Sequence, residues 1–229
     1  MKKRIAILSA PPIAPDGLAD MQRIWGSGTE IRFFSVLPDT TPEAVAPYTA
    51  DAGDRILMLG LGEGAPTMIS INKLTPQIEA LLAALQGQAD FAFFACAGDF
   101  PRLNSPLPII QPNMVFRNMI KTTLQSHMRL GVITPGEKQI PHVHASWLPY
   151  LAEAGLSKEQ LVVDWAPPSK ESATRCAQRL AAQNIDLVAV ECLGFKEELR
   201  EMIAREVKKP VILVRTVVAH LVREMIGVA

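Results

Sequence analysis

The chain alternates short apolar runs with longer segments of helical period. Buried strands are predicted for the β-branched and aliphatic runs at 5–8, 32–36, 55–59, 91–94, 130–133, 161–164, 187–190 and 211–214. The clearest helical segment is 171–183, whose apolar residues recur at i, i+3, i+4, i+7 and i+8: Ala173, Cys176, Ala177, Leu180 and Ala181. Cys176 belongs to this stripe, so we expect it to be a buried packing residue. The alternation predicts an α/β protein with mainly parallel sheets.

Two pairs of segments repeat within the chain. Residues 90–98 and 186–194 both consist of an aspartate, a strand of buried type and then Cys-x-Gly, and their cysteines, Cys96 and Cys192, are 96 residues apart. Residues 4–11 and 129–135 both contain a basic residue, an apolar strand, a hydroxyl residue and a proline. These repeats predict two related α/β halves, which we place at 1–116 and 117–214.

The first half is longer, and a hairpin explains the difference. Strands at 55–59 and 68–71 flank a glycine-rich connection at 60–66. Gly60, Gly62 and Ala65 also match G-x-G-x-x-A, with Glu79 further on, which is the pattern of a dinucleotide site. That site requires a helix directly after the turn. The alternation of period 2 at 68–71 favours a strand instead, so we interpret the segment as a hairpin.

Composition excludes several classes of protein. The 23 basic and 23 acidic side chains balance, whereas nucleic-acid binders and membrane-surface proteins carry clustered basic residues. Three cysteines without short spacing fit neither a secreted disulfide framework nor a zinc motif. The apolar run after the N-terminal lysines ends at Pro11, too early for a signal peptide, and no run reaches the ~20 residues that span a bilayer. We therefore expect a cytoplasmic protein with a packed core.

Cys96 and Cys192 carry the candidate chemistry. Each follows a predicted buried strand where the chain turns toward the next helix, which is the edge at which α/β sheets bind ligands. The helix N-termini would attract an anion and lower the pKa of each thiol from about 8.5 toward neutrality. Gly98 and Gly194 would let backbone N–H groups approach a carboxylate. The predicted site thus comprises the loops Cys96-Ala97-Gly98 and Cys192-Leu193-Gly194.

If the halves face each other, both thiols reach one carbon from opposite sides. One thiolate would remove a proton next to a carboxylate and the opposite thiol would return one to the other face, with no cofactor. Each sulfur would lie ~3 to 3.5 Å from that carbon, placing the unbonded sulfurs roughly 7 Å apart. Packing at strand ends is the alternative role for both cysteines, but their matching positions favour a shared site. Asp99 and Glu191 would oppose thiolate formation if their carboxylates pointed at the sulfurs. We expect them instead to bind loop amides or to support the residues that contact the substrate.

Histidines give a weaker signal. His142 and His144 could chelate a metal from a strand, but no carboxylate or third histidine is spaced to join them. We expect surface or loop histidines and no metal site. A Ser/His/Asp arrangement and a phosphate-binding G-x-x-x-x-G-K-[ST] loop are both missing from the sequence.

Three stretches together resemble the AroM family. They are Cys-Ala-Gly-Asp-Phe-Pro at 96–101, Arg-Leu-Gly-Val-Ile-Thr-Pro at 129–135 followed by Gln139, and Glu-Cys-Leu-Gly-Phe at 191–195. Segments 54–82 and 210–226 are also similar to AroM proteins, so the resemblance covers nearly the whole chain. The AroM family is itself similar to the aspartate/glutamate racemase superfamily, which includes hydantoin racemases.

The resemblance implies two flavodoxin-like lobes with a cleft between them, and a C-terminal helix, 215–229, that returns to the first lobe. It also implies that Cys96 and Cys192 are the opposed acid and base. Ser9 and Thr134, at the ends of the paired first strands, match positions that bind a substrate carboxylate, and Pro11 lies beside the first of them. Segment 9–15 departs from the family pattern, because it lacks the glutamine and arginine that are common there.

We therefore expect a cofactor-independent racemase or epimerase of a small carboxylate or amino-acid-like substrate. A decarboxylase or cis/trans isomerase of a small dicarboxylate on the same scaffold would need one thiol. A non-catalytic metabolite-binding protein is a third alternative. We expect no nucleic-acid or membrane partner. The last helix, 220–227, is expected to pack on the body of the protein through Leu221, Val222 and Met225, with a homodimer contact as the alternative.

Overall fold

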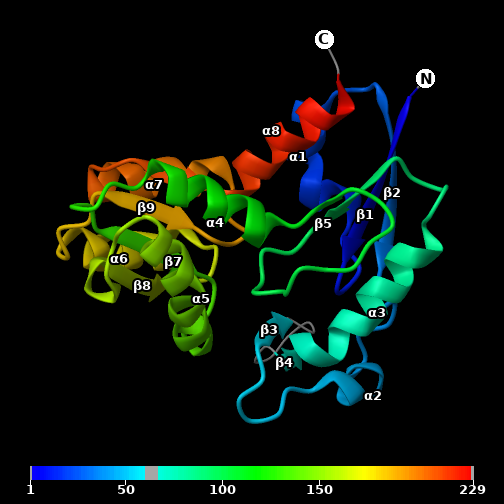
Figure 1. The fold of residues 1–229 in the computed structure, drawn as a ribbon, viewed down its shortest axis with the longest axis horizontal. Coiled ribbons are helices and arrows are strands. Elements are labelled where there is room, and N and C mark those ends of the chain that lie inside the picture. The colour runs from blue at the N-terminus through cyan, green and yellow to red at the C-terminus, as the bar shows by residue number, and fades with distance from the viewer. Residues whose placement is uncertain (1, 60–66, 228–229) are drawn as a thin grey trace. The chain divides into compact units, whose positions relative to one another are not determined.

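The computed structural model describes residues 2–59 and 67–227 (Figure 1). The chain divides into two compact units: unit 1 comprises Met1–Pro112 and Val218–Ala229, and unit 2 comprises Asn113–Val217. Each unit contains one parallel four-stranded sheet. The glycine-rich connection, with Gly60, Gly62 and Ala65, lies outside the described residues.

Unit 1 is built on the sheet order β2-β1-β5-β6. Its strands are β1 (Lys3–Ser9), β2 (Thr29–Ser35), β5 (Phe91–Phe94) and β6 (Ile109–Ile110), and its helices are α1 (Ala19–Trp25), α2 (Pro42–Val45) and α3 (Ile71–Ala84), with short 3-10 turns at Pro15–Leu18 and Ala46–Tyr48. Strands β3 (Ile56–Leu59) and β4 (Thr67–Ser70) pair antiparallel. The predicted hairpin is therefore confirmed. Glu79, the acidic residue of the rejected dinucleotide pattern, lies in α3 and accepts the Asn104 N–H at 2.8 Å.

Opposite faces of the unit 1 sheet pack on different helices because neighbouring residues of a strand point in opposite directions. Phe94 packs in one core cluster with the α3 residues Leu74 and Ile78. Phe93 meets the Trp25 indole of α1 edge-on, with ring centroids 6.0 Å apart. Figure 1 shows α3 on one side of this sheet, and α1 with the end of α8 on the other. β5 is consequently buried on both faces, as its unbroken apolar sequence indicates.

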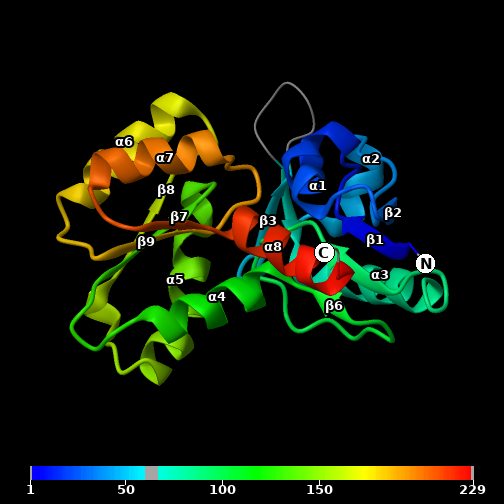
Figure 2. The same ribbon diagram turned by 90° about the horizontal axis from the view of Figure 1, so that it is seen from above.

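Unit 2 repeats the arrangement with the order β8-β7-β9-β10. Its strands are β7 (Leu130–Thr134), β8 (Leu161–Trp165), β9 (Leu187–Val190) and β10 (Val211–Leu213), and its helices are α4 (Pro112–Thr123), α5 (Ile140–Glu153), α6 (Lys170–Ala181) and α7 (Glu197–Val207), with 3-10 turns at Glu137–Gln139 and Lys158–Gln160. Helices α6 and α7 cover one face of the sheet, and α5 lies on the other (Figure 2). In both units the four strands of the parallel sheet follow the order 2-1-3-4, the beginning of the flavodoxin-like order.

The same hydrogen bonds recur at matching positions of the two units. The Arg4 N–H donates to Asp90 Oδ2 at 2.9 Å, and the Arg129 N–H donates to Asp186 Oδ2 at 2.9 Å. In return, each aspartate N–H donates to the carbonyl oxygen of its arginine, at 2.9 Å in unit 1 and 2.8 Å in unit 2. The repeats found in the sequence thus correspond to repeated structure, which confirms the predicted α/β class and the two related halves.

Helix α8 (Val214–Ile226) begins within one residue of the segment 215–229 that the resemblance implies, whereas the helix predicted from the pattern, 220–227, is too short. It begins directly after β10, so the predicted strand 211–214 loses its last residue, and it starts well before the predicted 220–227. Within unit 1, the Trp25 Nε1–H donates to the Ala219 carbonyl oxygen at 3.1 Å, which attaches α8 to α1. Val222 is fully buried, while Leu221 and Met225 are half-buried. Across the described residues, no helix has the length and apolar character needed to cross a membrane.

Cys176 lies on the buried stripe of α6, as predicted, whereas Ala181 at the end of that stripe is exposed. Burial, reinforced by the Asp164 carboxylate, raises the pKa of the Cys176 thiol to about 12. Its thiolate fraction at pH 8 is then ~10⁻⁴. We expect iodoacetamide to modify Cys176 of the folded protein last, at least about tenfold more slowly than Cys96 and Cys192, because Cys176 is fully buried whereas the other two are half-buried. Mass spectrometry of timed digests measures this order, and equal labelling of all three sites would contradict it.

Candidate functional site

Each candidate cysteine lies just beyond an inner strand of its own sheet. Cys96 follows the end of β5 by two residues, and Cys192 follows the end of β9 by two. The neighbouring strands β1 and β7 end at Ser9 and Thr134. Because Leu8 pairs with Phe94, and Ile133 pairs with Val190, each hydroxyl residue lies at the same sheet edge as the cysteine loop of its unit. The structure therefore contains two matching candidate half-sites, one in each unit, each with a cysteine loop beside a hydroxyl residue.

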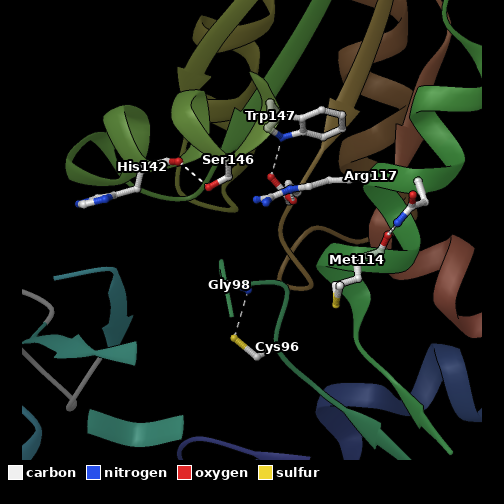
Figure 3. A network of polar contacts seen from close by, with 9 residues as sticks. Cys96, Gly98, Met114, Arg117, His142, Ser146 and Trp147 are labelled. Atoms are coloured by element: carbon white, nitrogen blue, oxygen red, sulfur yellow. Dashed lines mark hydrogen bonds and ion pairs between the residues drawn. The ribbon is translucent and has the colours of Figure 1, made fainter. Parts of the chain in front are cut away.

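Both thiols accept the N–H of the glycine two residues later. The distance from Gly98 N to Cys96 Sγ is 3.4 Å (Figure 3), and that from Gly194 N to Cys192 Sγ is 3.3 Å. A backbone donor aimed at sulfur stabilises the thiolate more than the thiol. These amides thus point at the sulfurs in this structure. Contact between either amide and a substrate carboxylate stays a prediction.

Little space remains beside either glycine. A Cβ at Gly98 would lie 3.1 Å from the Phe100 ring and 3.4 Å from Cys96 Sγ. A Cβ at Gly194 would lie 3.2 Å from Pro168 and 3.4 Å from Cys192 Sγ. Each glycine therefore allows the chain to fold back closely on its own cysteine.

The loop after Cys96 is held by a buried glutamine. Gln111 Nε2–H donates to the Pro101 carbonyl oxygen at 2.8 Å, and Gln111 Oε1 accepts the Leu103 N–H at 2.9 Å. The expectation that a helix follows Cys96 is wrong, because the chain continues as this loop to β6. Proline at 101, 106 and 108 lacks the N–H that a helix requires. After Cys192, helix α7 begins only at Glu197.

Ser9, Thr134 and Pro11 lie at the expected edge, but they are differently accessible. Ser9 is 4% exposed and Thr134 is 2% exposed, whereas Pro11 is half-buried. The Thr134 hydroxyl donates to Gln139 Oε1 at 3.3 Å. Gln139 ends the 3-10 turn that leads into α5, so this bond links the end of β7 to that helix. A substrate role for these three residues stays a prediction.

Glu191, directly before Cys192, is buried in an ion pair. Arg117 Nε lies 2.5 Å from Glu191 Oε1, and their side chains are 3% and 2% exposed. The Trp147 Nε1–H donates to Glu191 Oε2 at 3.0 Å (Figure 3). The Arg117 guanidinium also lies over the Trp147 ring, 5.7 Å from its centroid. The Glu191 carboxylate therefore binds side chains of α4 and α5.

Sequence reasoning missed Arg117, Trp147 and a second arginine, Arg215. Arg215 is 4% exposed, and its Nη1 donates to the Leu193 carbonyl oxygen at 2.6 Å. The sequence did hold one signal: Arg117 falls on the apolar stripe that Phe116 and Ile120 form on α4 and that Leu124 continues just beyond the helix. An arginine on such a stripe needs a buried partner, although the stripe does not identify that partner.

Burial dominates the pKa of Cys192 and raises it. The N–H groups of Gly194 and Phe195 and the charge of Arg215 act in the opposite direction and only partly offset burial. The expectation of a lowered pKa is therefore wrong for this thiol in the free protein. With its pKa raised, the Cys192 thiol is protonated at neutral pH. All three cysteines are free thiols.

The two candidate histidines lie on helix α5, not on a strand. Residues two apart on a helix point in different directions, so His142 and His144 cannot hold one metal ion as a pair. In Figure 3 the contact drawn to His142 is made by its backbone carbonyl oxygen, which accepts a hydrogen bond from the Ser146 hydroxyl at 2.7 Å. In the described part of the chain, no group of three or more His, Cys, Asp or Glu residues could hold a metal ion.

Solved structures with a similar fold include two glutamate racemases and a decarboxylase. The glutamate racemase isoform RacE1 of Bacillus anthracis has a TM-score of 0.60 at 13% identity, covering 98% of this chain and 82% of that one. Unliganded arylmalonate decarboxylase has a TM-score of 0.57 at 12% identity, covering 99% and 93%. Glutamate racemase of Aquifex pyrophilus has a TM-score of 0.55 at 14% identity, covering 97% and 83%. At these identities, the likeness concerns the fold alone.

Proteins of curated function give no match to this sequence. The model of the family described as AroM protein matches residues 7–226, which is almost the full length. This match includes both cysteine loops and the strands that position them. The chain therefore belongs to the AroM protein family.

Proposed function

We propose that the protein is a cofactor-independent racemase or epimerase of a small carboxylate or amino-acid-like substrate, with Cys96 and Cys192 as opposed acid and base. One observation carries this proposal. In each unit a cysteine that forms no disulfide lies two residues beyond an inner strand, β5 in unit 1 and β9 in unit 2. Each thiol accepts the N–H of the glycine in its own Cys-x-Gly sequence. Packing cysteines have no need of two matching positions with the same amide contact.

The proposed reaction moves one proton at a time. The thiolate of one cysteine takes the proton from the carbon next to the carboxylate, and the electron pair of the broken C–H bond delocalises onto that carboxylate. The thiol of the other cysteine then gives its proton to the opposite face, so a new C–H bond forms with inverted configuration. The two cysteines exchange protonation states, which prepares the enzyme for the reverse direction.

The half-sites also suggest where the substrate carboxylate binds. The hydroxyls of Ser9 and Thr134 come from the strands next to the cysteine loops and can donate to carboxylate oxygens. Pro11, with the loop residues Ala97, Gly98, Leu193 and Gly194, completes the proposed contacts. The approach of the two half-sites across a cleft is part of the proposal.

Single-thiol chemistry is the second candidate, and the surroundings of Cys192 favour it. The raised pKa keeps this thiol protonated. Loss of CO₂ from a small dicarboxylate breaks a C–C bond and leaves the electron pair on carbon, and a nearby thiol can supply the proton that this carbanion needs. In this alternative Cys96 would not transfer the proton.

A deuterium experiment tests the proposal. Single enantiomers of amino acids, hydantoins and hydroxy acids, and also arylated and alkylated malonates, are incubated with the protein in heavy water. Deuterium entry, optical purity and CO₂ release are followed together. We expect at least one enantiomerically pure substrate to gain deuterium as it loses optical purity, and the Cys96→Ser/Cys192→Ser double variant to do neither.

Cys176→Ser provides the matched control, since this thiol packs inside unit 2, and it should keep the wild-type rate. Exchange that persists in the double variant would refute the thiol mechanism. CO₂ release that needs Cys192 but not Cys96 would establish the second candidate instead.

A further inference from the structure

We propose that Arg215 and the Arg117–Glu191 pair are positioning residues for Cys192, which hold the residue on each side of it and set the charge that its thiol experiences. This inference rests on the proposed function for its biological purpose. Its geometry is independent of any substrate. It assigns roles to three buried charged groups that the proton transfers themselves do not use.

The residue before Cys192 is fixed through its side chain. Both carboxylate oxygens of Glu191 accept a hydrogen bond, one from Arg117 at 2.5 Å and the other from Trp147 at 3.0 Å. These partners belong to α4 and α5, two separate helices. The Glu191 N–H also donates to the Ile133 carbonyl oxygen at 2.9 Å, which ties the backbone to β7. Glu191 thus has little freedom to move, and its negative charge is paired with a cation.

The residue after Cys192 is fixed through its backbone. The Leu193 carbonyl oxygen accepts Arg215 Nη1 at 2.6 Å, and Arg215 is 4% exposed. Arg215 is the second residue of α8, so the rigid helix and the adjoining strand β10 determine where its guanidinium lies. A charge-assisted bond to a carbonyl is stronger than a neutral one. The Cys192 loop is therefore held on both sides by buried arginines.

These charges act on ionisation of the thiol in opposite directions. The charged groups whose contacts are described beside the Cys192 loop include Glu191 directly before it, Arg117 from α4 and Arg215 from α8. Arg117 pairs with Glu191, and Arg215 brings a second positive charge to the other side of Cys192. The charge of Arg215 lowers the pKa of Cys192 against the effect of burial. In unit 1 the residues on either side of Cys96 are Ala95 and Ala97, whose side chains cannot supply such a charge.

Alkylation of Cys192 as a function of pH tests this proposal without a substrate. The rate of iodoacetamide modification is measured at this site by mass spectrometry from pH 6 to pH 11, with the full-length protein. The midpoint of the profile reports the pKa, and the plateau reports access to the sulfur. We expect Arg215→Met to raise the midpoint and slow the reaction at pH 8 by about tenfold for each pKa unit. Arg215→Lys keeps the charge and should recover most of this loss.

Glu191→Gln should move the midpoint the other way, because it removes the negative charge of the residue directly before Cys192. A purely structural role would loosen the loop and shift both variants in the same direction. Arg223→Met, an exposed position on the same helix, is the matched control and should give the wild-type profile. The proposal would be overturned if the midpoints of Arg215→Met and Glu191→Gln shifted in the same direction. It would also be overturned if both variants gave the same midpoint as Arg223→Met. If Arg215→Met does not fold, the opposite shift in Glu191→Gln decides the question.

This result can be distinguished from failure of the proposed function. Opposite shifts of the Cys192 midpoint together with no deuterium exchange would support the positioning role and reject the racemase. Deuterium exchange by the wild type together with unchanged Cys192 midpoints in the variants would support the racemase and reject the positioning role.

Discussion

Cys192→Ser is expected to stop racemisation from either enantiomer, with a loss of roughly 10²- to 10⁴-fold, the contribution typical of a positioned acid or base. Deuterium exchange should nevertheless survive for one enantiomer. The enantiomer whose hydrogen faces Cys96 can still lose it to that thiolate and regain a deuteron from the same sulfur. Inversion fails, since a serine hydroxyl is a far weaker acid than a thiol. Chiral chromatography combined with mass spectrometry separates exchange from inversion.

Cys96→Ser should give the mirror result. Racemisation stops again, but exchange with retention now occurs in the opposite enantiomer, whose hydrogen faces Cys192. Because burial raises the pKa of Cys192, this exchange should keep accelerating as the pH rises into the alkaline range. Exchange of the same enantiomer by both variants would show that the thiols do not act on opposite faces.

Arg117→Met is expected to destabilise unit 2 by about 3 to 5 kcal/mol, the range found when one partner of a buried ion pair is removed. Glu191 would keep the N–H of Trp147 but lose its guanidinium, and both original side chains are at most 3% exposed. Methionine fills a similar volume, so the charge accounts for most of the effect. Denaturant unfolding followed by circular dichroism measures the loss.

A second substitution identifies the cause. In Arg117→Met/Glu191→Met the unbalanced carboxylate is removed, and we expect stability to recover to within about 2 kcal/mol of wild type, since an apolar replacement of a whole buried pair is often neutral. Lys121→Met on the same helix is the control. Lys121 pairs with the exposed Glu153, and such surface pairs contribute about 0 to 1 kcal/mol. A loss in Arg117→Met no larger than this control would contradict the argument.

The sequence predicted those parts of the fold that follow from local patterns. Unbroken apolar runs located β1, β5, β7 and β9, and the repeated Asp and Cys-x-Gly placed both cysteines at the ends of strands. β6 escaped prediction because two residues are too few to show a period. The start of α8 escaped the helix 220–227 that the pattern predicts, because no glycine or proline between β10 and α8 marks a boundary.

The candidate site was predictable only where its residues are near one another in sequence. The loops that contain Cys96 and Cys192 show a visible repeat, but Arg117 lies 74 residues from Glu191, and Arg215 lies 22 residues from Leu193. No pattern within one segment pairs such residues. The pKa of Cys192 was predicted in the wrong direction for a related reason: its burial depends on neighbours from several elements.

The return of α8 to unit 1 bears on how the chain reaches its native state during synthesis. Unit 2 ends at Val217, whereas unit 1 also includes Val218–Ala229. The indole of Trp25 finds its acceptor on Ala219 only after all of unit 2 has been synthesised. Domains usually fold as units in the order in which the ribosome releases them. Here unit 2 has all of its residues before unit 1 does, because the second segment of unit 1 follows unit 2 in the chain.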